Sequence, residues 1–129
     1  MQRASTTGSD QHPRPANKDN IMDTPLYALS AVQLLERYRA RTLSPVDVTK
    51  AVLARIERWE PSIHATYGLD AEAALASARA SEARWTQGTP QGELDGVPVT
   101  LKENIATRGT PSPIGSAATV LSPAAADAP

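Results

Sequence analysis

A lysine that directly follows an apolar stretch is the residue of this chain best suited to chemistry. Lys102 comes after the alternating residues Val97–Leu101, inside the segment Leu94–Ile105. At the end of a strand, apolar neighbours would hold the lysine stem and remove water from its amine. Desolvation favours the neutral amine, which can accept a proton, so Lys102 is a candidate general base. The alternative is a surface lysine paired with Glu103, and the segment taken by itself favours that interpretation.

The other residues that could do chemistry are isolated. Ser116 follows a glycine, but no strand precedes it and no base stands at a fixed spacing, so we interpret it as a loop serine. His12 and His64 are single histidines without a carboxylate nearby in the pattern, and they predict no metal site. The absence of cysteine excludes thiolate catalysis and sulfur-rich zinc sites. These residues therefore predict no metal site.

Two of the elements that would position such a site begin at recognisable capping residues. Ser30 and Gln33 form a capping box, which predicts a helix from about Ala31 to Ala40. Ser44, followed by a proline at the first helical position, predicts a second helix. Pro61 should end this helix, because the residue before a proline is disfavoured in the helical region.

A third helix is predicted from a different cap. Asp70 precedes an alanine-rich segment that reaches Trp85, and Gly88 is a natural residue at a helix C-terminus. Trp59 and Trp85 could suggest a ligand-binding box. At helical spacing we interpret them instead as anchors of the core.

Extended segments are few. Residues Ile63–Tyr67 alternate weakly and predict either a short strand or an extended linker. Val97–Leu101 alternate more clearly and predict a short strand, in which Pro98 favours an edge or the first strand residue. From Thr89 onward, turn-forming residues dominate. The sequence thus predicts a helical layer followed by at least one strand.

Composition and charge exclude several classes of protein. The chain has 129 residues, which allows one ordinary domain, and its 13 basic and 14 acidic residues give a net charge of −1. This balance provides no basic surface for nucleic acid or for anionic lipid. No apolar run is long enough to span a membrane. The lack of cysteine fits a reducing compartment, and we expect a cytoplasmic location.

The chain consists of two parts that differ in composition and in apolar patterning. Residues 1–24 carry turn formers and few large apolar side chains, so we expect a disordered leader, with Met22 as a candidate start of translation or of the ancestral protein. The leader lacks the apolar core of a secretory signal. Organised patterning occupies residues 25–129, and its end has no closing cap. We expect this part to be the truncated beginning of a larger domain.

The segment around Lys102 resembles the signature region of the amidase signature family, which are serine hydrolases with a Ser-cisSer-Lys triad. Family members carry a stretch like L-x-G-[VI]-P-[VI]-x-[VL]-K-[DE]-N-[IV], and here it reads L-D-G-V-P-V-T-L-K-E-N-I. The continuation Thr107–Ser116 is similar to the family's T-x-G-x-P-[ST]-x-x-G-[ST] loop. The stretches Ser44–Thr49 and Arg55–Pro61 are similar to segments common in the family's N-terminal helices.

The resemblance implies a fold, a reaction and a role for one residue. The fold would be α/β, with this chain supplying the N-terminal helical layer and the first strand of an incomplete domain. The intact relative would hydrolyse a small-molecule carboxylic amide through an acyl-serine intermediate, without metal or cofactor. Lys102 matches the triad lysine, and Glu103 stands where aspartate is more common. The two serine motifs of the family are missing from the chain, so we expect it to be inactive alone.

Two other classes of function stay open on the sequence. The family includes the amide-hydrolysing subunit of tRNA-dependent amidotransferases, which works in a complex. Alternatively, the chain is a non-enzymatic helical remnant that binds a partner, or a second copy of itself, through exposed apolar helix faces.

Overall fold

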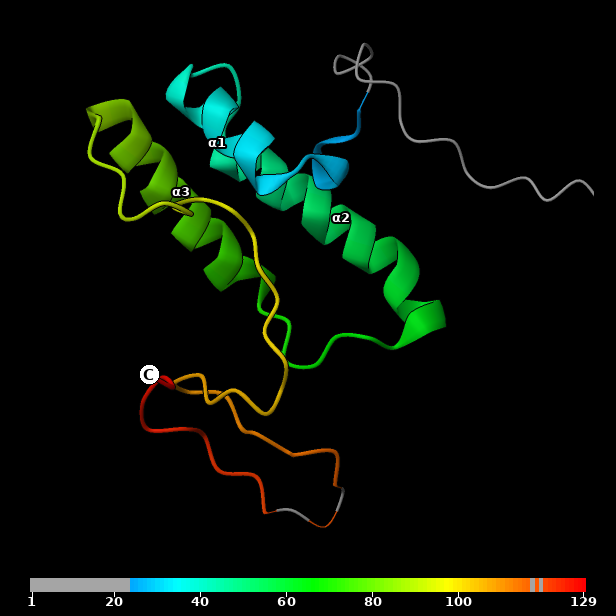
Figure 1. Ribbon diagram of the computed structural model, residues 1–129. Coiled ribbons are helices and arrows are strands. Elements are labelled where there is room, and N and C mark those ends of the chain that lie inside the picture. Colours follow the sequence, from blue (N-terminus) through cyan, green and yellow to red (C-terminus); the bar gives the residue numbers. More distant parts are fainter. Residues whose placement is uncertain (1–23, 117, 119) are drawn as a thin grey trace, which may run out of the picture.

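The computed structural model describes residues 24–116, 118 and 120–129. A short 3₁₀ helix, η2 (Leu26–Ala28), precedes three α-helices: α1 (Ala31–Arg39), α2 (Pro45–Ile63) and α3 (Ala71–Gln87). After α3 the chain turns back along the helices and then forms a separate loop that contains the C-terminus (Figure 1). The leader expected over residues 1–24 lies, except for Thr24, outside the described residues.

Helix α1 begins as its sequence predicts. The Ser30 side chain accepts the N–H of Gln33, and the Gln33 side chain accepts the N–H of Ser30 at 2.8 Å, which completes the capping box. The helix buries Leu34, Leu35 and Tyr38 on one side. Arginines in its last turn lie near the negative end of the helix dipole.

Helix α2 starts at the predicted cap but runs past the predicted stop. The Ser44 hydroxyl accepts the N–H of Val46 at 2.9 Å and also contacts Glu82 of α3. Pro61 lies inside the helix, which ends at Ile63. The prediction that Pro61 ends α2 is wrong because a proline in the last turn removes only one helical hydrogen bond.

The linker after α2 is fixed by its own contacts. His64 adopts a left-handed conformation, with φ of 45°, and donates its N–H to the Glu60 carbonyl at 2.9 Å. The Glu60 carboxylate accepts the N–H of Thr66 at 3.0 Å, and this bond lowers the pKa of Glu60. Of the two predictions for residues 63–67, the strand is wrong and the linker holds for residues 64–67 only, because Ile63 is the last residue of α2.

Helix α3 follows its predicted signals at both ends. The Asp70 carboxylate accepts the N–H of Ala73 at 2.9 Å, and Gly88 ends the helix with φ of 75°. Its buried residues are Ala78 and Ser81, so α3 presents small side chains to α2, with which it packs. Small side chains allow this close approach while burying little apolar area.

The predicted strand Val97–Leu101 is not formed. Val97 donates its N–H to the Leu94 carbonyl in a turn, and no described segment pairs with the residues that follow. Val99 is 69% exposed and Leu101 60% exposed. Since a strand depends on hydrogen bonds to a neighbouring strand, an alternating pattern without such a partner stays extended coil. The described residues are therefore helical, with isolated bridges only at Arg108–Ala124 and Pro111–Pro123.

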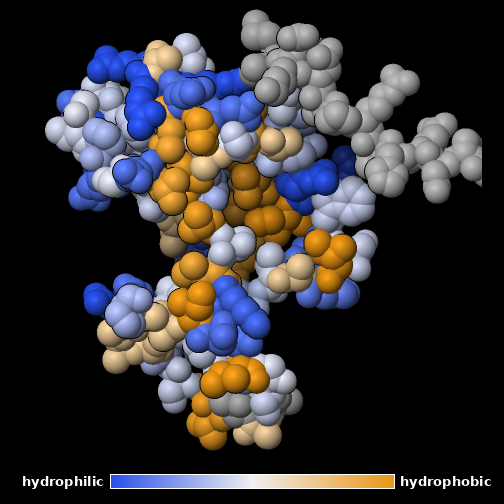
Figure 2. All heavy atoms as spheres, in the orientation of Figure 1, coloured by the Kyte–Doolittle hydropathy of each residue, from blue (hydrophilic) through white to orange (hydrophobic). Residues whose placement is uncertain are grey.

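The core is small and lies where α1 meets the start of α2. It consists of the following buried residues: Leu29, Leu34, Leu35, Tyr38 and Val48. Partly buried side chains pack around it, Trp85 and Val97 among them. Many apolar side chains stay exposed, and those after residue 97 belong to the extended chain and loop rather than to helix faces. Figure 2 shows apolar side chains both over the helices and on the lower part of the molecule.

Candidate functional site

Lys102 lies on the surface, in the coil that follows the exposed residues Val99 and Leu101. Its carbonyl accepts the N–H of Ile105 at 2.9 Å, which forms a turn. Its side chain makes no ion pair with any described residue, and the Glu103 carboxylate instead accepts the N–H of Ile114 at 2.8 Å. Among the described residues, the pairing of Lys102 with Glu103 is therefore absent, and so is the apolar enclosure that a buried base needs.

Ser116 is exposed as well. Its hydroxyl accepts the N–H of Ala118 at 3.2 Å, and its own N–H bonds the Pro113 carbonyl. These local turn contacts agree with the interpretation of Ser116 as a loop serine. His64 caps α2, and His12 lies outside the described residues.

The best-defined polar arrangement lies seven residues before Lys102, at Asp95. Arg84 of α3 donates two hydrogen bonds to this carboxylate, from Nε at 2.8 Å and from Nη2 at 2.5 Å. The backbone N–H of Gln91 donates a third at 2.8 Å. The Asp95 side chain is only 4% exposed. A buried carboxylate needs partners that replace its hydration, and here the Arg84 guanidinium and the Gln91 N–H are those partners.

The backbone of Asp95 and Gly96 is held to the helices by two aromatic residues. The indole N–H of Trp85 donates to the Asp95 carbonyl at 3.0 Å, and the Tyr38 hydroxyl donates to the Gly96 carbonyl at 3.1 Å. The two rings lie 6.1 Å apart, tilted by 50°. Helices α1 and α3 thus each donate one hydrogen bond to the same dipeptide. We call this set of five residues, Tyr38, Arg84, Trp85, Asp95 and Gly96, the Asp95 clasp.

The position of Gly96 in the clasp has no room for a side chain. It has φ of +83°, and a Cβ at this position would lie 2.5 Å from the Ser81 hydroxyl and 2.9 Å from Pro45 Cγ. The chain therefore passes directly over the start of α2 and the middle of α3. This close approach fixes where the segment that leads to Lys102 leaves the helices.

The electrostatics of the clasp follow from its contacts. The hydrogen bonds from Arg84 hold the pKa of Asp95 well below its usual range, and the same bonds raise the pKa of Arg84. Burial raises the pKa of Tyr38 to about 12. Asp95 is therefore ionised and Tyr38 neutral at ordinary pH, the states that the observed hydrogen bonds need.

Sequence reasoning identified part of this site. It predicted Trp85 as a core anchor, which the structure confirms, but it predicted the same for Trp59, which is 42% exposed. It missed Arg84 and Asp95 altogether. The available signal was the spacing of Ser81, Arg84 and Trp85, which places these three residues on one face of α3.

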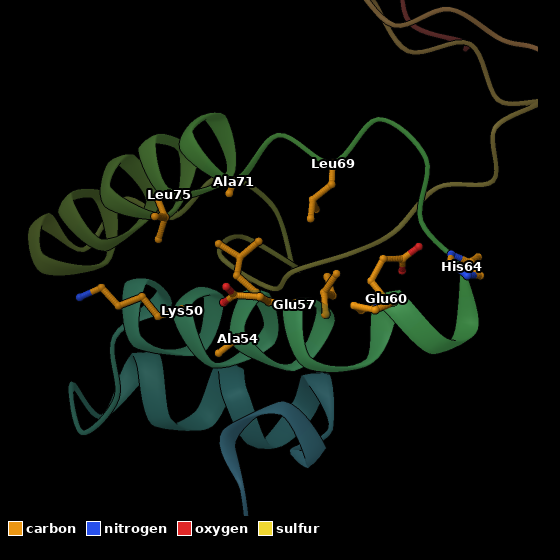
Figure 3. Close-up of a pocket in the computed structure, with 11 residues that line it drawn as sticks. Lys50, Ala54, Glu57, Glu60, His64, Leu69, Ala71 and Leu75 are labelled. Carbon is orange, nitrogen blue, oxygen red and sulfur yellow. The ribbon is translucent and has the colours of Figure 1, made fainter.

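A groove of about 720 Å³ lies between α2 and the beginning of α3. Figure 3 shows Leu69 and Leu75 pointing toward α2, with Glu57 and Glu60 at the side of the groove. Neither Lys102 nor Ser116 lines it. It is therefore separate from the residues to which sequence reasoning assigned chemistry.

The described residues contain neither a metal-binding group nor a membrane-spanning helix. Within 24–116, 118 and 120–129, His, Asp and Glu side chains form no group of three that could hold a metal ion. In the same residues, none of the helices has the combination of length and apolar character that crossing a bilayer requires.

Comparisons with known proteins match this chain to a family. A family model described as "Amidase" matches residues 47–129, a range that includes the Asp95 clasp from Arg84 onward and Lys102. No solved structure matches the chain.

Several curated relatives share one name, which describes a subunit of glutamyl-tRNA(Gln) amidotransferase. The protein from Acidothermus cellulolyticus is 44% identical over 87 residues, which are 67% of this chain and 17% of the relative. That from Chloroflexus aurantiacus is 41% identical over 93 residues, 72% of this chain and 19% of the relative. The protein from Myxococcus xanthus is 40% identical over 88 residues, which are 68% of this chain and 18% of the relative. The chain thus spans about a fifth of the length of these relatives, and by the family match it belongs to the amidase family.

Proposed function

We propose that this chain supplies the helical layer and the catalytic lysine of an enzyme that hydrolyses a carboxylic amide. The observation that carries the proposal is the family match over residues 47–129, which contains Lys102 in the segment L-D-G-V-P-V-T-L-K-E-N-I. The complete fold in this proposal is α/β. Residues 97–101 would become its first strand once a neighbouring strand provides hydrogen-bond partners.

In the proposed reaction Lys102 acts as the base. Its neutral amine takes a proton, relayed by a bridging serine, from the serine that attacks the amide carbonyl carbon. The C–N bond then breaks and the proton leaves with the ammonia or amine. Water hydrolyses the resulting acyl-serine to the acid. The chemistry uses no metal or cofactor.

The structure supports one step of this proposal, the positioning of the lysine segment. Strand 97–101 would begin directly after Gly96, whose carbonyl is bonded to Tyr38 at 3.1 Å. The Arg84–Asp95 ion pair fixes the preceding residue. A base must lie within about 3 Å of the proton that it takes, so the lysine depends on such anchoring.

The chain alone is expected to be inactive, because Lys102 has no nucleophile to activate. The serine motifs of the family do not occur in this sequence. An oxyanion hole and an attacking serine each account for a large part of the rate of acyl transfer.

A second function is favoured by the names of the relatives. Each of the three described above is named as an amidotransferase subunit, which implies that it works with other proteins. In this version the chain belongs to an amide-hydrolysing subunit of a larger complex rather than to a free-standing amidase. Either enzyme would act on a small-molecule amide, in the cytoplasm.

A chimera tests the proposal. Residues 25–129 would replace the matching segment of the Acidothermus cellulolyticus relative, and release of ammonia from simple amides would be measured. The proposal predicts an active chimera that loses activity by roughly 10² to 10⁴ with Lys102→Ala. Lys50→Ala, which changes an exposed lysine of α2, is the matched control and should leave activity near that of the parent chimera. Equal activity of the two variants would contradict the role of Lys102.

A further inference from the structure

A cluster of two arginines and two aromatic residues covers the part of α2 that lies under η2. The guanidinium of Arg55 lies 4.5 Å from the centre of the Tyr27 ring and 5.3 Å from that of the Trp59 ring. Arg58 approaches Trp59 as well, at 5.7 Å. Both rings are partly open to solvent, with Tyr27 43% and Trp59 42% exposed. We call these four residues the Arg55 cluster.

The arginines of the cluster have unused hydrogen-bonding capacity. Both side chains are exposed, and neither forms a hydrogen bond or an ion pair with any described residue. A guanidinium has five N–H donors in one plane. Contact with two rings restricts the Arg55 guanidinium, and its N–H donors, which no described residue accepts, suit two-point binding of an oxyanion.

The carboxylates of α2 nearest the cluster line a different surface. Glu57 and Glu60 line the groove against α3, together with Lys50. Arg55 and Arg58 belong to the cluster with η2, which contains no carboxylate. The cluster is therefore a local cationic surface on a chain whose net charge is −1.

This chemistry favours one class of occupant. Tyr, Trp and Arg are the residues enriched at the energetic centres of protein interfaces. Nucleic acid is disfavoured, because binding to a phosphate backbone needs an extended basic surface and this chain has a balanced charge. A short acidic stretch of protein complements two guanidiniums beside two flat rings.

We propose that the Arg55 cluster is a docking surface for an acidic segment of a partner protein. It binds carboxylates through Arg55 and Arg58, and the apolar stems of the acidic residues pack on Trp59 and Tyr27. The proposal is independent of the role of Lys102, since binding is measured on the chain without any amide substrate.

The experiment titrates the full chain with blocked hexaglutamate and, separately, with blocked hexaglutamine at low salt. NMR follows the indole N–H of Trp59 and the Nε–H of Arg55. The expected result is saturable shifts at the cluster with hexaglutamate only, while the indole of Trp85 stays unchanged. Absence of saturable binding, or equal binding of hexaglutamine, overturns the proposal.

Matched variants locate the binding site. Arg55→Gln should weaken hexaglutamate binding at least about fivefold, as expected for loss of a two-point charged contact. Arg79→Gln removes the same charge from an exposed position on α3 and should change binding less than about twofold. Equal weakening by both variants would show a general charge effect and overturn the proposal. Circular dichroism verifies that each variant is as helical as the parent.

A final arm separates a protein partner from nucleic acid. Single-stranded hexauridylate is titrated under the same conditions. The proposal expects binding weaker than that of hexaglutamate and little change in it with Arg55→Gln. Binding at least as tight as that of hexaglutamate and equally sensitive to Arg55→Gln would assign the cluster to nucleic acid and overturn the proposal.

Discussion

Arg84 and Asp95 are eleven residues apart and form a two-point ion pair that joins helix α3 to the segment leading to Lys102. The carboxylate is almost fully buried, while the guanidinium stays 27% exposed on its side chain. A buried carboxylate needs its partner far more than an exposed one does, because its lost hydration must be replaced. The pair therefore helps to hold residues 91–97 on the helices, together with the hydrogen bonds from Trp85 and Tyr38.

Replacing Asp95 should destabilise the fold and change its response to acid. Asp95→Asn removes the opposite charge from Arg84 and keeps one acceptor oxygen, and we expect the free energy of unfolding to fall by about 2 kcal/mol at neutral pH. Urea denaturation measures this loss. Glu93→Gln is the matched control, since Glu93 is exposed and makes no hydrogen bond or ion pair within the described residues.

The direction in which the folding stability changes at acid pH follows from the pKa of Asp95. The folded pKa of Asp95 lies below its ordinary value of 3.8, so the unfolded chain binds the proton first as pH falls. The contribution of the pair is therefore complete above that value and is lost progressively below it. We expect the parent chain to lose stability below about pH 4 more steeply than Asp95→Asn does. Parallel curves for the two proteins would contradict this assignment.

Two glycines provide a test of the close approach at residue 96. Gly96→Ala meets Ser81 and Pro45 and also has an unfavourable φ, so it should cost at least about 2 kcal/mol of folding free energy. Gly92→Ala has a similar φ of +74° but nothing within 4 Å, and it should cost only about 1 kcal/mol. Thermal unfolding of the two variants side by side gives the difference. If the two costs are equal, the packing of Gly96 contributes nothing.

Removing the Tyr38 hydroxyl should have a smaller effect with a distinctive pH dependence. Tyr38→Phe loses the bond to Gly96 and should cost about 1 kcal/mol near neutrality. Because burial raises the pKa of Tyr38 to about 12, the unfolded chain releases this proton first as pH rises. The parent chain should thus lose stability above about pH 10, and the variant should lose less. Tyr67→Phe, at an exposed tyrosine, should behave like the parent at all pH values.

The parts of the fold that could be predicted are those encoded by neighbouring residues. The starts of all three helices depend on contacts within three positions, such as Ser30 with Gln33 and Asp70 with Ala73. The end of α2 could not be predicted from Pro61, because one lost hydrogen bond is too small a cost to stop a helix in its last turn.

The candidate site depended on contacts that a local pattern does not contain. Tyr38 and Gly96 are 58 positions apart, and neither residue alone predicts their hydrogen bond. The alternation of Val97–Leu101 does favour a strand, but a strand also needs a neighbour to pair with, and no described segment provides one. Lys102 stays a prediction that rests on resemblance, and the apolar enclosure that the pattern suggested for it is absent among the described residues.

Comparison of Lys102→Arg with Lys102→Ala in the chimera tests the central claim most directly. Arginine keeps the positive charge but stays protonated at any working pH, so it cannot take a proton from a serine. If Lys102 is the base, both variants should lower the acylation rate by roughly 10² or more while the chimera stays folded. If Lys102→Arg keeps near-normal activity and only Lys102→Ala loses it, the lysine acts through its charge, and the assignment of Lys102 as the base is contradicted.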